Sequence, residues 1–143
     1  MADQAVCPLC DELGGIVLWH DDRLRIVRVQ DTHFPAFYRI IWQHHVAEMT
    51  ELNEADRAYL MDMVYRIEQL LRDHLQPTKI NLASLGNVVP HLHWHVIARF
   101  DWDTHFPNPV WGERLRDATP YKDNLLQNPI SLIDQKIAAF SQH

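Results

Sequence analysis

The sequence predicts a single α+β domain, built from an antiparallel sheet of about five strands, one long helix and a C-terminal helix. Short apolar stretches with strand-like alternation come first, a long stretch with helical periodicity follows, and strand-like stretches and a second helical pattern complete the chain. A chain of 143 residues can bury a core without disulfides. Because no repeat or linker interrupts the pattern, we expect one domain over residues 1–143.

The composition is that of a globular protein and argues against several functional classes. Hydrophobic residues make up 47% of the chain and charged residues 22%. The 19 acidic and 13 basic residues give a net charge of −6 without a basic cluster, so we expect no nucleic-acid partner. The sequence has no apolar run long enough for a membrane span and no signal-like start, and it holds only two cysteines. We therefore expect a cytoplasmic protein without a membrane partner.

The first part of the chain predicts a β-hairpin and a third strand. Residues 16–19 are apolar and residues 24–29 alternate, and the polar residues 20–23 supply the turn between them. Residues 37–42 follow Pro35 and form the third strand.

Residues 53–76 predict a long amphipathic helix that lies on the sheet. Asn53 is suited to cap its first turn and Pro77 to end it. Apolar residues recur at three- and four-residue spacing. These residues are Leu60, Met63, Val64, Ile67, Leu70, Leu71 and Leu75.

The remaining elements are two strands and a final helix. Residues 79–85 are strand-like, residues 86–87 resemble a turn, and residues 88–100 predict the last strand. The segment 101–143 is rich in Pro, Trp and Asn until an amphipathic helix over residues 130–140. An aromatic loop precedes this helix, and we expect it to fill an interface or the core rather than to cap a base. Its members are Trp102, His105, Phe106 and Trp111.

Three histidines alternate along the last predicted strand, at His91, His93 and His95. Successive side chains of a strand point to opposite faces, so the three imidazoles share one face. The apolar residues between them face the other way and can pack against the helices. A single histidine is usually structural, whereas three at strict alternation favour a functional site. Two chemistries fit, a three-histidine zinc site with an open position and nucleophilic attack by an imidazole on phosphorus.

The segment resembles the signature of the histidine triad family, in which three alternating histidines are separated and followed by apolar residues. The matching residues are His91, Leu92, His93, Trp94, His95, Val96 and Ile97. Pro35 and His45 match an earlier proline and histidine of the family, Gly86 and Asn87 stand where Gly-Gln is common, and Asn81 lies near a nucleotide-contacting position. The resemblance covers residues 7–100 and leaves the extension 101–143 without a match.

The resemblance implies a bacterial member similar to dinucleoside polyphosphate hydrolases. His93 would attack the α-phosphorus of a nucleotide conjugate and carry the nucleotidyl group covalently. His95 would bind the phosphate and assist the leaving group, and His91 would orient His93 or complete a metal site. No cofactor would be needed for this chemistry, and the substrate would be a dinucleoside polyphosphate, a nucleoside phosphoramidate or a related conjugate. The substrate-binding residues would be Asn81, Asn87 and Gln30.

Three positions depart from the family pattern. Val88 stands where many relatives have a Ser or Thr that contacts the leaving group, which weakens the case for a phosphoramidate preference. Val29 stands where an acidic or amide residue commonly holds the ribose, with Gln30 and Asp31 adjacent to it. Ala98 replaces the usual proline, a change with little chemical consequence.

Cys7 and Cys10 have the Cys-x-x-Cys spacing of half a tetrahedral zinc site. By resemblance to zinc-bearing relatives and to galactose-1-phosphate uridylyltransferases, His45 and His91 would supply the other two ligands of a structural zinc. His44 competes with His45 for this role, and a reduced, metal-free cysteine pair is the alternative.

The resemblance also implies a homodimer, because family members commonly pair into one continuous sheet. Two other functions stay open at this point. One is a non-catalytic nucleotide- or zinc-binding protein, and the other is a metallohydrolase with zinc at the three histidines themselves.

Overall fold

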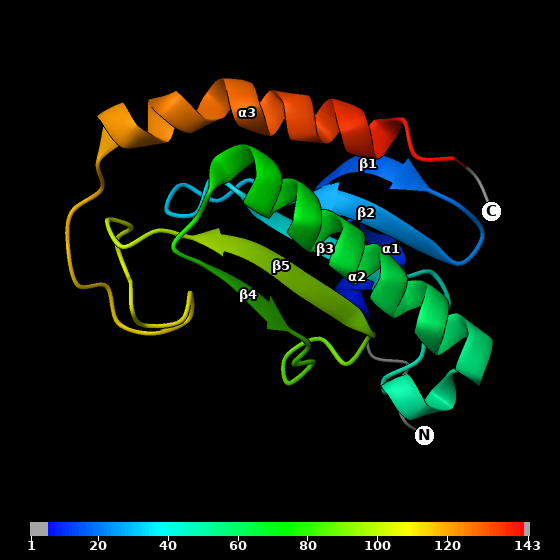
Figure 1. Ribbon diagram of the computed structural model, residues 1–143. Helices are drawn as coiled ribbons and strands as arrows, with labels where there is room; N and C mark the ends of the chain where they lie inside the picture. Colours follow the sequence, from blue (N-terminus) through cyan, green and yellow to red (C-terminus); the bar gives the residue numbers. More distant parts are fainter. Residues whose placement is uncertain (1–5, 142–143) are drawn as a thin grey trace.

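The computed structural model describes residues 6–141, which form a five-stranded antiparallel sheet with two long helices on one face (Figure 1). The strand order is β1-β2-β3-β5-β4. The strands are β1 (Ile16–His20), β2 (Leu24–Arg28), β3 (Phe37–Trp42), β4 (Lys79–Ala83) and β5 (His93–Arg99). The helices are α1 (Pro8–Asp11), the 3-10 turn η1 (Met49–Glu51), α2 (Glu54–Leu75) and α3 (Pro120–Ala138). The predicted fold class is confirmed.

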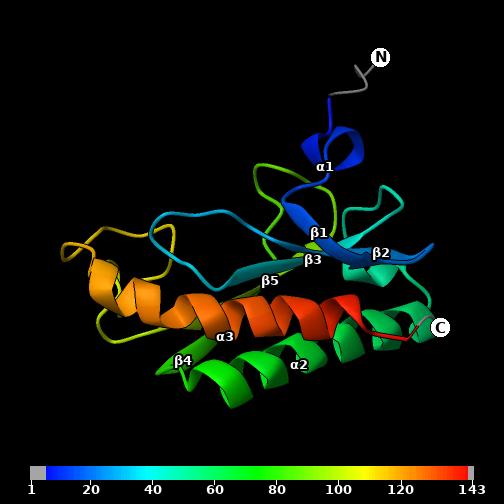
Figure 2. The same ribbon diagram turned by 90° about the horizontal axis from the view of Figure 1, so that it is seen from above.

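The helices divide the two faces of the sheet unequally. Figure 2 shows α2 and α3 side by side on one face and the short α1 on the other. The core fills the space under the long helices, where alternate strand residues meet the apolar stripes of α2 and α3. Fully buried members include Leu24, Ile26, Tyr38, Ile40, Val96, Leu60, Met63, Ile67, Leu71 and Ile133.

The long helix α2 begins and ends at the residues that the sequence marks. The side chain of Asn53 accepts a hydrogen bond from the backbone N–H of Asp56, as expected for an N-cap. Gln76 ends the helix in the left-handed conformation, with a φ of 48°, and Pro77 follows. None of the helices within residues 6–141 is long and apolar enough to cross a lipid bilayer.

Three predicted boundaries are wrong. The last strand was expected over residues 88–100 but begins at His93, because the segment before it turns away from the sheet. The strand expected over residues 79–85 ends at Ala83. The C-terminal helix was expected over residues 130–140 but begins ten residues earlier, at Pro120. Its first half is mostly polar and exposed and buries only Leu126, so the apolar periodicity on which the prediction depended is weak there.

The C-terminal extension is anchored to the domain by α3. Asp134 accepts hydrogen bonds from Tyr38 Oη and Arg28 Nε, both at 2.8 Å. Burial and the neighbouring Asp134 carboxylate raise the pKa of Tyr38, so this phenol stays a donor. At the other end of α3, the indole N–H of Trp19 donates to the carbonyl of Phe140 at 2.9 Å. Helix α3 is therefore part of the core rather than an appendage.

Replacing a buried residue of α3 should destabilise the whole domain. Ile133 is fully buried, whereas its neighbour Leu132 is 43% exposed. We expect Ile133→Ala to lower the free energy of unfolding by about 2–5 kcal/mol and Leu132→Ala by less than about 1 kcal/mol, as measured by urea denaturation. Equal effects of the two substitutions would show that α3 is not packed as described.

Candidate active site and metal centre

The face of the sheet opposite the long helices carries the predicted catalytic histidines. In the pairing of β3 with β5, Ile41 lies opposite His93 and Arg39 lies opposite His95. Residues directly opposite on antiparallel strands share a face, so these four side chains lie together. The apolar residues Leu92, Trp94 and Val96 belong to the core cluster under the helices, as predicted. The alternation therefore places His93 and His95 on one face of the sheet and the apolar residues on the face that packs against the helices.

His93 is held in one orientation by a backbone hydrogen bond. Its Nδ1 lies 2.6 Å from the carbonyl oxygen of His91. Because a carbonyl can only accept, Nδ1 carries the proton and the lone pair of a neutral ring lies on Nε2. No residue within 6–141 hydrogen-bonds this Nε2. Burial lowers the pKa of His93 and the positive charge of Arg39 lowers it further, so the ring is neutral and its Nε2 is nucleophilic at neutral pH.

His95 lies against His93 in an edge-to-face arrangement, with ring centroids 5.0 Å apart. The ring is 7% exposed, and its buried Nδ1 lacks a partner among the described residues. Burial, with the neighbouring His93 and Arg39, lowers the pKa of His95 to about 4. A buried polar atom without a partner is costly. His95 is therefore a neutral ring beside His93, and its Nδ1 can still form a hydrogen bond.

His91 has a different role from the other two histidines, because it precedes β5 and its ring is turned toward the N-terminal segment. Its Nε2 donates to the carbonyl of Trp42 at 2.6 Å, which leaves the lone pair on Nδ1. That Nδ1 lies 3.4 Å from Sγ of Cys7 and of Cys10 and 3.3 Å from Nδ1 of His45. The prediction that all three imidazoles project from one strand is wrong for His91. Its backbone, not its ring, orients His93.

The two cysteines, His45 and His91 form one compact group of metal-ligating atoms. All four ligand atoms lie within 4.8 Å of one another, and Sγ of Cys10 lies 3.3 Å from Nδ1 of His45. Tetrahedral zinc at ordinary bond lengths would separate such sulfur and nitrogen ligands by about 3.3 to 3.8 Å. Nδ1 of His91 offers a lone pair to this group, and Nδ1 of His45 offers one in the tautomer protonated at Nε2. The donor set therefore fits a closed structural zinc site with no open position.

The residues around this group explain its geometry. The backbone N–H groups of Cys10 and Asp11 donate to the carbonyl of Cys7, so the short helix α1 brings the two sulfurs together. The hydrogen bond from His91 to Trp42 is the kind of outer contact that orients a metal-binding histidine. His44 is exposed and is not a member of the group.

The three histidines do not converge on a common metal. Within residues 6–141, neither His93 nor His95 belongs to a group of side chains that could hold a metal ion. His91 faces the cysteines, and Nδ1 of His93 is occupied by a carbonyl. This geometry argues against the metallohydrolase alternative.

The predicted substrate-binding residues lie in three different environments. Asn81 is on the histidine face, where its Oδ1 accepts a hydrogen bond from Arg99 at 2.9 Å, which leaves its amide N–H groups available. Asn87 is exposed in the loop between β4 and β5. Gln30 is exposed and lines a cavity of about 500 Å³ between the β2–β3 connection and α3, together with Asp134. The predicted histidines do not line this cavity, so the structure does not bring Gln30 to them.

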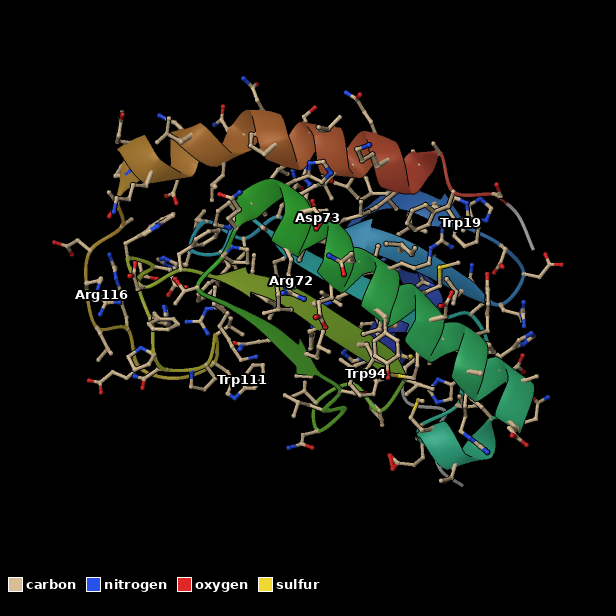
Figure 3. The ribbon with its side chains drawn as sticks, viewed as in Figure 1. Trp19, Arg72, Asp73, Trp94, Trp111 and Arg116 are labelled. Carbon is tan, nitrogen blue, oxygen red and sulfur yellow. The ribbon has the colours of Figure 1, made fainter. Side chains whose placement is uncertain are left out.

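The predicted aromatic loop is divided between core and surface. Trp102 packs against the core and stacks on Phe100 at 4.8 Å, and His105 is buried. Trp111 is 55% exposed on the outside of the loop (Figure 3). The core interpretation therefore holds for Trp102 and His105 but not for Trp111.

Sequence reasoning missed Arg39, which lies directly opposite His95 and whose charge acts on both His93 and His95. A signal was available, because Arg39 is the single charge in the otherwise apolar and aromatic strand β3. A charge that interrupts a buried strand needs either a partner or a ligand.

The comparisons with known proteins agree with this fold. A model of the HIT domain family matches residues 11–102. A histidine triad protein from Bradyrhizobium japonicum is 30% identical, with a TM-score of 0.70, over 87% of this chain and 92% of that one. No curated protein matches the sequence.

Two less similar structures share the fold. A zinc-bound histidine triad family protein from Mycobacterium smegmatis is 17% identical, with a TM-score of 0.59, over 91% of this chain and 96% of that one. A hypothetical histidine triad nucleotide-binding protein from Sulfolobus tokodaii is 18% identical, with a TM-score of 0.55, over 95% of this chain and 97% of that one. The fold is an antiparallel α+β domain that carries two neighbouring histidines on the face without long helices. The chain belongs to the histidine triad (HIT) family.

The buried, neutral His95 should make folding stability depend on pH. Its pKa of about 4 in the folded protein lies below the ordinary value of 6.5, so the unfolded chain takes up a proton first as the pH falls. The stability that neutral His95 provides is complete above pH 6.5 and is lost as the pH falls toward 4, with a slope of up to about 1.4 kcal/mol per pH unit.

Urea denaturation at pH 7, 6 and 5 measures this slope. We expect His95→Gln to make the loss of stability between pH 7 and pH 5 shallower. His44→Gln, at an exposed histidine, should leave the slope unchanged. Identical slopes in all three proteins would mean that His95 is not buried in a neutral state.

Proposed function

We propose that the protein is a nucleotidyl hydrolase or transferase that acts on the α-phosphorus of a nucleotide conjugate through a covalent nucleotidyl-histidine intermediate. The observation that carries the proposal is the orientation of His93, whose Nδ1–H is held by the carbonyl of His91 and whose Nε2 has no protein partner within the described residues. A neutral imidazole with a free Nε2 is the form that attacks phosphorus. The nucleotide-binding relative from Sulfolobus tokodaii supports a nucleotide as the ligand.

The reaction would proceed in two displacements at phosphorus. In the first, the Nε2 lone pair of His93 forms a bond to the α-phosphorus, and the bond from phosphorus to the bridging atom breaks. The electron pair leaves with the bridging atom, which takes up a proton. In the second, a water oxygen attacks phosphorus and releases a proton, which balances the proton taken up by the leaving group. The bond to Nε2 breaks, and its electron pair returns to the imidazole. Splitting one difficult displacement into two is the advantage of a covalent intermediate.

The residues around His93 have supporting roles in this proposal. His95 would hydrogen-bond the phosphate or the bridging atom, because its Nδ1 lacks a protein partner within residues 6–141. Asn81 would offer its free amide N–H groups to the substrate, while Arg99 holds its oxygen. A dinucleoside polyphosphate is the favoured substrate class, since Val88 is 92% exposed and has no hydroxyl to offer a phosphoramidate leaving group. Asn87 and Gln30 are weaker candidates for substrate contacts.

His93→Ala should abolish turnover while His44→Ala leaves it intact, because only the first removes the nucleophile. We expect kcat/KM for a labelled diadenosine polyphosphate to fall by about 10³-fold or more in His93→Ala. A mass increase on wild-type His93, equal to one nucleotidyl group, stable to alkali and lost in acid as expected for a P–N bond, should be absent from the variant. Chelators should leave the chemical step of the folded protein unchanged.

Other outcomes would point to other functions. If His93→Ala turned over substrate at the wild-type rate, His93 would not be the nucleophile. If neither protein turned over a polyphosphate or a phosphoramidate, yet both bound nucleotides, the non-catalytic binding function would stand instead. An adenosine phosphoramidate tested in parallel separates the two substrate classes.

We also propose that Cys7, Cys10, His45 and His91 hold a structural zinc ion, which would supply a rigid cross-link between the N-terminal segment and the strand that carries His93. The compactness of the four ligand atoms supports this site. The zinc-bound relative from Mycobacterium smegmatis supports a zinc ion in this family. The ion would not contact the substrate.

Removing one thiolate should release the metal. We expect about one zinc per chain in the wild type, measured by plasma mass spectrometry, and a clear loss in Cys10→Ser together with a lower melting temperature. His44→Ala should keep its zinc. A wild-type protein purified and titrated with zinc that still held no metal, or a Cys10→Ser variant with unchanged zinc, would contradict the site.

A further inference from the structure

Three arginines lie on the histidine face of the sheet, and two of them are fully engaged by the protein. Strand pairing places Arg25 opposite Ile41, Arg39 opposite His95, and Arg99 on β5 itself. The guanidinium of Arg25 donates to the carbonyls of Leu9, Glu12 and Leu13 and to the side chain of Gln43. The guanidinium of Arg99 forms an ion pair with Asp103 and donates to Asn81 and to the carbonyl of Asn108.

Arg39 differs from these two in what its guanidinium contacts. Its Nη1 donates to the carbonyl of Gly14 at a long 3.2 Å, and its buried Nε has no partner within the described residues. None of the ion pairs that the described residues form includes Arg39. Burial lowers the pKa of this guanidinium, which nevertheless stays charged because its ordinary pKa is so high. A half-buried cation without a counter-charge is costly for the resting protein.

The position of Arg39 relates this unpaired charge to the nucleophile. Side chains of directly opposite residues on antiparallel strands begin about 4.5–5.5 Å apart, and Arg39 is directly opposite His95. The charge of Arg39 acts on both His93 and His95. An imidazole can donate or accept hydrogen bonds but carries no permanent charge, whereas a guanidinium is always charged and can balance the charge of a phosphate. Of the three arginines on the histidine face within residues 6–141, Arg39 has the most donors left over by the protein.

We propose that Arg39 contacts the substrate and binds the phosphate group on which His93 acts, with Nδ1 of His95 as a neighbouring contact. The inference rests on the proposed role of His93 and extends it to the recognition of the substrate's charge. A guanidinium matches the geometry of two phosphate oxygens, and its charge would stabilise the negative charge on the nonbridging oxygens during the displacement. Selectivity for anionic phosphate esters would then come from Arg39, while the histidines perform the chemistry.

The test is to compare the binding of nucleotides and nucleosides by calorimetry, without turnover. The probes are AMP and GMP, with adenosine and guanosine as their uncharged counterparts. We expect Arg39→Gln to weaken nucleotide binding by about 10- to 100-fold, which is the contribution of hydrogen bonds to a charged group, and to leave nucleoside binding unchanged. Arg39→Lys should be intermediate, because an ammonium keeps the charge but loses the planar fork.

A matched control is Arg72→Gln. Arg72 is an exposed arginine on α2, in the helical layer on the other side of the sheet (Figure 3), and its loss should change neither affinity. Melting curves establish whether the Arg39 variants are folded. If Arg39→Gln is unfolded, the comparison of nucleotide and nucleoside affinity is made with Arg39→Lys.

Several results would overturn the proposal. An equal loss of nucleoside and nucleotide affinity in Arg39→Gln would place Arg39 against the base or ribose. Unchanged nucleotide affinity in Arg39→Gln would show that Arg39 does not bind the phosphate. A wild type that bound neither AMP nor GMP would contradict the phosphate site itself. Failure of the catalytic proposal is separate, since it would appear as normal nucleotide binding that depends on Arg39 but without turnover or a His93 adduct.

Discussion

The orientation of His93 depends on one hydrogen bond, from its Nδ1 to the carbonyl of His91. A neutral imidazole carries one proton, so holding that proton on Nδ1 leaves the lone pair on Nε2. The bond requires the chain at His91 to turn away from the sheet just before β5 begins. The irregular segment before β5 therefore holds His93 in the tautomer that leaves the lone pair on Nε2.

The same turn connects the nucleophile to the metal-ligating group. The ring of His91 points to the cysteines while its carbonyl points to His93, so one residue belongs to both sites. Arg25 reinforces the arrangement by holding three carbonyls of the α1–β1 segment, and Trp42 fixes the tautomer of His91. On the opposite side of the face, Arg99 and Asp103 hold the loop that follows β5. His93 and His95 thus lie between two segments that are each fixed by a buried arginine.

Much of the fold follows from local patterns in the sequence. The third strand and the long helix were predicted to within a residue, because Pro35, Asn53 and Pro77 mark ends that depend on nearby residues alone. The placement of His93 and His95 on one face follows from strand alternation. Helix α3 was predicted ten residues too short because the apolar periodicity is weak in its first half, although Pro120 at its first turn is a local signal for a helix start.

The parts of the site that the sequence could not supply depend on contacts between distant segments. Pro90 is a local signal that a central strand does not continue through this segment. The path of the chain at His91 depends on distant contacts, because Trp42 and Val46 on a neighbouring segment hold it. The missing partner of Arg39 is likewise a property of the whole face, since it depends on what the other two arginines hold.

The tautomer of His93 can be measured directly, and it decides whether Nε2 has the free lone pair that attack on phosphorus requires. Nitrogen-15 NMR of the imidazole in the resting protein at neutral pH distinguishes a protonated ring nitrogen from a bare one. The account predicts that Nδ1 of His93 is protonated and that Nε2 is not. A proton on Nε2, or a rapid exchange between both tautomers, would contradict it.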